Sequence, residues 1–153
     1  MLYFLSYRTM DIHEKQERII KEFKVLGDWQ ERYKHIIKLG QKLDPLEEKH
    51  KKDENLVRGC QSQVWLIAEL QDGKVVFKAD SDAAITKGLV ALMVRFYSGE
   101  DPDTIIVTKP EFIERIGMQE HLSPTRSNGL VSMVKQMKIY AMVYKSKLQQ
   151  QAS

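Results

Sequence analysis

The single cysteine of this chain, Cys60, is the strongest candidate for chemistry, because it stands between a glycine and an apolar run. Gly59 has no Cβ, so the backbone beside the thiol is free to turn sharply or to be approached closely. The run that begins at Val64 is expected to anchor the far side in a core. The thiol would then lie on a loop held by rigid structure. Free cysteine is also among the most often buried residue types, so a role as a small hydrophobe is the alternative.

Cys60, His121 and Asp82 together supply the residue types of a nucleophile, a base and an orienting acid, which a cysteine hydrolase needs. The same three side chains could instead hold zinc or iron. Both interpretations require the three groups to converge in space. Their ordinary roles are a hydrogen bond within a loop for His121 and the start of a helix for Asp80 and Asp82.

Sulfur transfer is a third chemistry open to Cys60. In this reaction a thiolate attacks the outer sulfur of a persulfide and keeps that sulfur as its own persulfide. A single cysteine suits the reaction, because a second thiol nearby would form a disulfide and release the cargo as sulfide. A positive neighbour such as Arg58 or Arg126 would favour the thiolate by lowering the pKa of the thiol from its usual value of about 8.5.

The length of 153 residues fits one domain, expected to span 1–153 with a flexible tail at 1–10. The apolar stretch at 1–5 is too short for a secretory signal peptide, and Met10 is an alternative start. One cysteine permits no internal disulfide, which agrees with a reducing compartment such as the cytoplasm. No run reaches the ~18 apolar residues of a membrane span, so no membrane association is expected.

The net charge of +3 is mild, but its distribution is uneven, because no acidic residue occurs from His121 to Ser153. This basic end could meet an acidic partner, although a solvated helix face explains the same pattern. A nucleic-acid module is a weaker alternative, since the chain has no aromatic-rich stacking motif. No nucleic-acid partner is therefore expected.

Hydrophobic periodicity predicts two amphipathic helices near the start of the chain, at 11–26 and 28–40, which we expect to form an antiparallel pair. Asp28 with Glu31 three positions later matches a helix-capping pattern. Charges of both signs at 47–54, without an apolar stripe, predict a solvated turn of helix or a mobile loop.

The middle of the chain changes to a strand-like pattern at 64–70 and 74–79. Asp72-Gly73 between these runs predicts a tight hairpin, because both positions favour positive φ. Leu56-Val57 is expected to add a third strand, which would place Cys60 at the rim of the sheet.

The last third of the chain predicts helices at 83–97 and 111–116, a polar loop at 121–129, and a long helix from Leu130 onward. Pro102 and Pro110 mark a connecting region between the first two helices. The order of elements predicts an α+β fold, with a small three-stranded antiparallel sheet and helices packed on one side.

Three blocks of sequence surround the candidate residues in a distinctive order. They are Gly59-Cys60-Gln61-Ser62-Gln63-Val64-Trp65, Asp80-Ser81-Asp82-Ala83-Ala84-Ile85 with Lys87-Gly88-Leu89, and His121-Leu122-Ser123-Pro124-Thr125-Arg126-Ser127 with Gly129-Leu130. Together these blocks resemble the signature of the SufE family of cysteine desulfurase accessory proteins, which includes the closely related CsdE branch. The match also includes Asp28-Trp29 and spans residues 11–148.

The resemblance implies that Cys60 accepts persulfide sulfur from a desulfurase of the SufS or CsdA type. It further implies that the chain stimulates this pyridoxal phosphate enzyme, has no cofactor of its own, and passes sulfur to an iron-sulfur scaffold complex. The implied fold is that of the U-type iron-sulfur scaffolds.

The supporting residues expected around the thiol are Gly59, Gln61 and Ser62 in its own loop, Asp82 at the opposite edge, and His121 and Arg126 in the 121–129 loop. The alternative function is an iron-sulfur assembly scaffold. One cysteine argues against it, because a stable cluster usually takes about four protein ligands.

Overall fold

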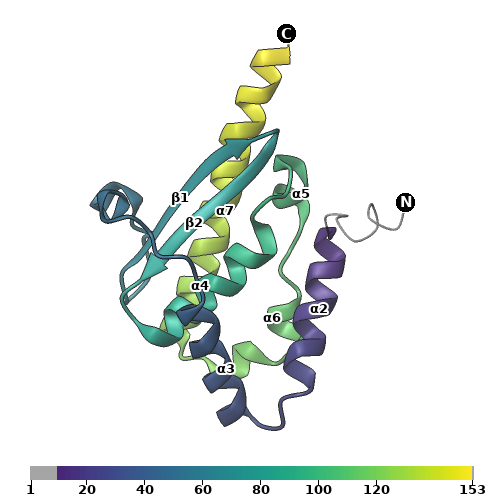
Figure 1. The fold of residues 1–153 in the computed structure, drawn as a ribbon, viewed down its shortest axis with the longest axis vertical. Coiled ribbons are helices and arrows are strands. Elements are labelled where there is room, and N and C mark those ends of the chain that lie inside the picture. Colours follow the sequence, from purple (N-terminus) through teal and green to yellow (C-terminus); the bar gives the residue numbers. More distant parts are fainter. Residues whose placement is uncertain (1–9, 153) are drawn as a thin grey trace.

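Two helices open the part of the chain that the structure, a computed structural model, describes, namely residues 10–152 (Figure 1). They are α2, Ile12–Lys24, and α3, Trp29–Gln41, and the chain reverses between them. Asp28 caps α3 by accepting a hydrogen bond of 2.9 Å from the Glu31 amide. Both predicted helices are confirmed, with small differences at their ends. The tail expected at 1–10 lies outside the described residues except for Met10.

The charged run at 47–54 forms two short 3₁₀ turns, η1 (Glu48–His50) and η2 (Asp53–Asn55). Lys51 lies between them with its side chain folded inward. Its Nζ is 3.6 Å from an Asp80 carboxylate oxygen and 5.7 Å from the ring centre of Trp65. The run therefore lies against the sheet at Lys51, whereas the sequence predicts a solvated turn of helix or a mobile loop.

The predicted hairpin is confirmed as β1 (Val64–Gln71) and β2 (Lys74–Ser81), which pair antiparallel from end to end. Asp72 and Gly73 both have positive φ, at 52° and 76°, as a two-residue hairpin turn requires. At the start of β1 and along most of β2 alternate residues are buried, and the hairpin packs on α4 (Ala84–Tyr97), so one of its faces covers the core.

The predicted third strand at Leu56-Val57 is not confirmed, because among residues 10–152 the sheet has two strands. Leu56 forms only one bridge, to Trp65, and the chain then turns away at Gly59, whose φ is +90°. The remaining edge of β1 is covered by the helix α7 (Pro124–Ala152), since Tyr144 of that helix donates a hydrogen bond of 2.8 Å to the Ala68 carbonyl. A side chain thus occupies an edge that another strand would have paired with.

The rest of the chain is mostly helical (Figure 1). Its elements are α4 (Ala84–Tyr97), α5 (Pro102–Val107), α6 (Phe112–Arg115), η3 (Met118–His121) and α7 (Pro124–Ala152). Helix α4 packs on the hairpin, α5 packs on α7, and α6 lies beside α2. The α+β class and the helices at 83–97 and 111–116 are confirmed. No helix in the described part of the chain is both long and apolar enough to cross a bilayer.

The polar loop predicted at 121–129 is largely wrong, because α7 begins at Pro124. Ser123 Oγ accepts a hydrogen bond of 3.3 Å from the Arg126 amide, and proline suits the first helical position. The apolar stretch 105–107, predicted as a connection, is likewise the end of α5, which Asp101 caps at the Thr104 amide at 2.9 Å.

Helices α3 and α4 approach closely through two glycines. A Cβ atom at Gly88 would lie 2.0 Å from the Ile36 carbonyl oxygen, and one at Gly40 would lie 2.8 Å from the Gly88 amide nitrogen. Neither position has room for a side chain. This contact fixes α4 in the middle of the fold, with its buried residues facing both α3 and the sheet.

Candidate functional site

Cys60 lies at the centre of a short loop, residues 58–62, which we call the thiol loop. Both ends of the loop are held. On the entering side, the Val57 amide donates a hydrogen bond of 2.8 Å to the Val64 carbonyl. On the leaving side, the Gln63 amide donates to Asp82 Oδ1 at 3.0 Å. Asp82 therefore positions the base of the loop.

The thiol loop rests against the first turns of α7. The Cys60 thiol donates to the Gly129 carbonyl oxygen at 3.7 Å, and a Cβ atom at Gly129 would lie 3.3 Å from Sγ. A Cβ atom at Gly59 would lie 2.6 Å from Ser132 Oγ. The two glycines allow this close approach, and Gly59 also supplies the left-handed φ that the turn requires.

A cavity of about 320 Å³ opens beside the half-buried thiol. Its lining combines apolar side chains with hydroxyl, amide and guanidinium groups. The lining residues are Cys60, Gln61, Ser62, Val64, Thr86, Leu89, Val90, Ser123, Thr125, Arg126, Gly129, Leu130 and Met133. The volume leaves room beside Sγ for an added sulfur atom and for part of the group that delivers it.

Burial raises the pKa of the Cys60 thiol above its ordinary value. The shift is opposite to the one that a nearby cation would produce. Arg126 lines the cavity from the first turn of α7, but its side chain is exposed. The thiol in this conformation is therefore the protonated, weakly nucleophilic form at neutral pH.

The rate of Cys60 alkylation by iodoacetamide is expected to rise with pH through a midpoint above the ordinary thiol value, because only the thiolate reacts. The measurement is the alkylation rate of the native protein against pH, followed by intact mass. Protein unfolded in urea is the control and should give a lower midpoint. A native midpoint at or below the unfolded one would contradict the effect of burial.

His121 lies away from the thiol cavity. Its ring stacks on that of Trp29, with the ring centres 4.1 Å apart, and its carbonyl oxygen accepts a hydrogen bond from the Tyr33 hydroxyl. Neither His121 nor Asp82 lines the cavity that Cys60 opens into. Within residues 10–152 no group of three or more His, Cys, Asp or Glu side chains could hold a metal ion. The triad and the metal site considered from the sequence are therefore not assembled.

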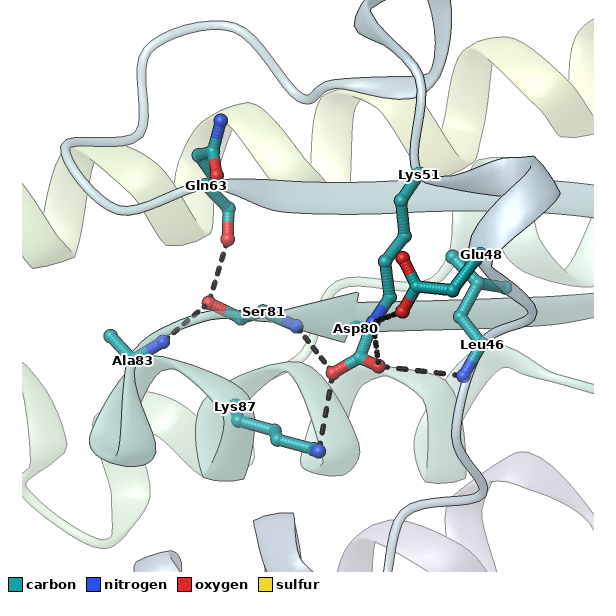
Figure 2. A network of polar contacts seen from close by, with 8 residues as sticks. All are labelled: Leu46, Glu48, Lys51, Gln63, Asp80, Ser81, Ala83 and Lys87. Carbon is teal, nitrogen blue, oxygen red and sulfur yellow. Dashed lines mark hydrogen bonds and ion pairs between the residues drawn. The ribbon is translucent and has the colours of Figure 1, made fainter.

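Asp80 is a buried carboxylate that joins three segments, and sequence reasoning assigned it only to a helix start (Figure 2). It accepts hydrogen bonds from the amides of Ser81 at 2.8 Å and Leu46 at 3.4 Å. Lys87 of α4 and Lys51 lie 3.2 Å and 3.6 Å from its oxygens. Burial alone would raise the pKa of Asp80, but the Ser81 amide and the Lys87 ammonium lower it overall.

The Asp80 contacts lie directly beneath the base of the thiol loop. Ser81, whose amide binds Asp80, donates its hydroxyl to the Gln63 carbonyl at 2.8 Å (Figure 2). Ser81 and Asp82 together hold Gln63 by both its carbonyl and its amide. The inward-turned Lys51 is the feature that links this network to the charged run. The inward position of Lys51 is hard to predict from the sequence, since nothing distinguishes Lys51 from the other lysines at 47–54.

Comparison with known proteins decides the family. The domain described as "SufE: Fe-S metabolism associated domain" matches residues 17–141. The chain belongs to the SufE family. A relative in Synechocystis sp., an uncharacterized SufE-like protein, is 40% identical over 127 residues, which are 83% of this chain and 80% of that protein. The family links the chain to iron-sulfur metabolism.

The SufE-family fold also has a solved counterpart. The solution structure of a hypothetical protein from Thermus thermophilus superposes with a TM-score of 0.72. The match covers 86% of this chain and 96% of that one, at 21% identity. It supports the α+β arrangement of the fold.

Proposed function

We propose that this SufE-family protein is a sulfur acceptor and relay, in which Cys60 takes persulfide sulfur from a cysteine desulfurase of the SufS or CsdA type. The observation that carries the proposal is the position of the lone thiol, on a loop held at both ends and beside a cavity. The protein then delivers the sulfur to an iron-sulfur scaffold complex and stimulates the desulfurase by removing its product. Both partners would meet it in the cytoplasm.

The transfer step exchanges one sulfur-sulfur bond for another. The Cys60 thiolate attacks the outer sulfur of the donor persulfide, a bond forms between Sγ and that sulfur, and the bond within the donor breaks. The donor cysteine leaves as a thiolate and takes up a proton, while the Cys60 proton passes to solvent. No net oxidation or reduction occurs, so no oxidant or reductant is required.

The raised pKa of Cys60 places a condition on this step. Because burial favours the protonated thiol, the acceptor reacts well only after the thiol loop has moved out of contact with Gly129 or the donor site has stabilised the thiolate. The partner therefore activates the thiol on docking. A thiol that stays protected until then would react slowly with other electrophiles.

After transfer, the cavity supports the role of a carrier. Val64, Leu89, Val90, Leu130 and Met133 provide apolar walls beside Sγ. An apolar pocket limits access of reducing thiols to the persulfide. The chain also offers no second cysteine to displace the sulfur as sulfide.

The proposal assigns pyridoxal phosphate to the donor enzyme and no cofactor to this chain. The alternative function, an iron-sulfur scaffold, would need about four ligands for a stable cluster. No observation among residues 10–152 favours that alternative over sulfur transfer.

The test is to incubate the purified protein with the desulfurase and free cysteine and to measure its intact mass without reductant. We expect a gain equal to one sulfur atom or a small multiple of it, reversed by a reducing thiol. Omission of free cysteine is the control and should give no gain. A protein whose mass stays unchanged in the complete mixture would contradict the proposed function.

A further inference from the structure

The outer face of α7 is exposed although it is partly apolar. Ile139, Met142 and Val143 remain 40%, 50% and 47% exposed. The opposite side of the same helix is buried at Met133, Met137 and Ala141. Helix α7 is thus apolar on its outer side as well as toward the core. A helix whose outer side faces only water is expected to be polar on that side.

This exposed face lies in line with the thiol loop. Ser132, which contacts the turn at Gly59, is seven residues before Ile139 and eleven before Val143, and at 3.6 residues per turn these spacings place all three on one side of α7. At 1.5 Å per residue, Ile139 and Val143 lie about 10 Å and 16 Å along the helix from Ser132. A typical interface buries roughly 800 Å² on each partner, enough to cover the face and the thiol loop together.

The charges on α7 favour a partner that carries acidic groups. No Asp or Glu occurs from His121 to Ser153. Lys138 and Lys145 are engaged with α5, where Lys145 Nζ lies 2.7 Å from an Asp103 oxygen and Lys138 binds backbone carbonyls. Lys135 and Lys147 lie exposed beside the apolar face, with Lys147 Nζ 5.3 Å from the ring centre of Tyr144. A second copy docked through α7 would bring lysine against lysine, so self-association through this face is disfavoured.

We propose that Ile139, Met142 and Val143, flanked by Lys135 and Lys147, form the docking face for the sulfur donor, the cysteine desulfurase. This inference rests on the proposed function and names the surface that it uses. The donor is the proposed occupant because the face continues from the thiol loop, so an enzyme that presents its persulfide to Cys60 would cover both. Its matching surface is an apolar patch edged by Asp or Glu side chains.

The test is the dissociation constant for the desulfurase, measured by isothermal titration with the wild-type protein and the double variant Ile139→Glu/Val143→Glu. Two carboxylates placed in an apolar contact are expected to weaken binding roughly tenfold or more. Lys135→Glu should weaken binding less and should reduce its dependence on salt. Val25→Glu is the matched control, because Val25 is 83% exposed at the distant end of α2, and its affinity should equal that of the wild type.

Loading of Cys60 by inorganic polysulfide, without the enzyme, separates docking from thiol chemistry and from folding. The double variant should load from polysulfide at the wild-type rate. The docking face would be overturned if the double variant bound the desulfurase with wild-type affinity, or if Val25→Glu weakened that binding as much as the double variant does. Either result would leave the proposed function intact. A wild-type dimer that the double variant converts to a monomer would also overturn it. If the desulfurase never loads wild-type Cys60, the proposed function itself fails.

Discussion

Replacing Cys60 with serine is expected to abolish sulfur acceptance, so that the variant gains no mass from the desulfurase and cysteine. The reaction needs a thiolate, and a serine hydroxyl stays protonated and forms no persulfide. Serine fits the site, because its hydroxyl is smaller than the thiol that contacts the Gly129 carbonyl. We expect the free energy of unfolding to change by about 1 kcal/mol or less. Intact mass and urea unfolding measure the two effects separately.

The control for this substitution moves the single thiol to another surface. In the double variant Cys60→Ser/Val25→Cys the thiol is highly exposed but lies at the end of α2. It should alkylate readily and yet gain no sulfur from the enzyme. A mass gain equal to that of the wild type would mean that any accessible thiol suffices and that the thiol loop has no special role.

Replacing Gly88 with alanine is expected to destabilise the fold by about 3 kcal/mol. The added Cβ would lie 2.0 Å from the Ile36 carbonyl oxygen and 2.6 Å from its carbonyl carbon, so backbone rather than a flexible side chain must move. Helices α3 and α4 would have to separate along their contact, which would loosen the core beneath the hairpin. For a chain of this size such a loss lowers the melting temperature by about 6–12 °C. Circular dichroism on heating measures it.

Gly27→Ala is the matched control for Gly88→Ala. No atom lies within 4 Å of a Cβ at Gly27, and its φ is not positive. The same chemical change should therefore alter the free energy of unfolding by about 0.5 kcal/mol or less. Equal losses at both glycines would show that the close contact between α3 and α4 is not the cause of the destabilisation by Gly88→Ala.

Much of this fold could be predicted because its signals are local. The apolar periodicity of α2, the capped start of α3, the Asp72-Gly73 turn and the apolar pattern of α4 depend on residues close together in sequence. The third strand could not be judged in this way. The free edge of β1 is covered by tyrosines more than 70 residues later in the chain. The local sequence at Leu56-Val57 does not indicate that these tyrosines occupy the edge that a third strand would need.

The candidate site was predicted in part, for a similar reason. Cys60 was recognisable as the candidate because it is the single cysteine of the sequence and follows a glycine, and Gly59 indicated a turn there. The role of His121 depends on Trp29 and Tyr33, which are distant in sequence, so its place outside the cavity could not be foreseen. Asp80 was assigned to a helix start because acidic residues often precede helices, but its partners Lys51 and Leu46 come from a segment without a recognisable pattern.

The fixed ends of the thiol loop limit how far its sulfur can travel. Val57 and Gln63 are held to the sheet, and Cys60 is three residue steps from each of them. An extended chain advances about 3.3–3.6 Å per residue, so the Cys60 backbone can rise only about 10 Å above the loop base. A persulfide buried deeper than this beneath an enzyme surface is out of reach unless the enzyme brings it outward. In the proposed function, the length of this tether would therefore select among sulfur donors by the depth of their active sites.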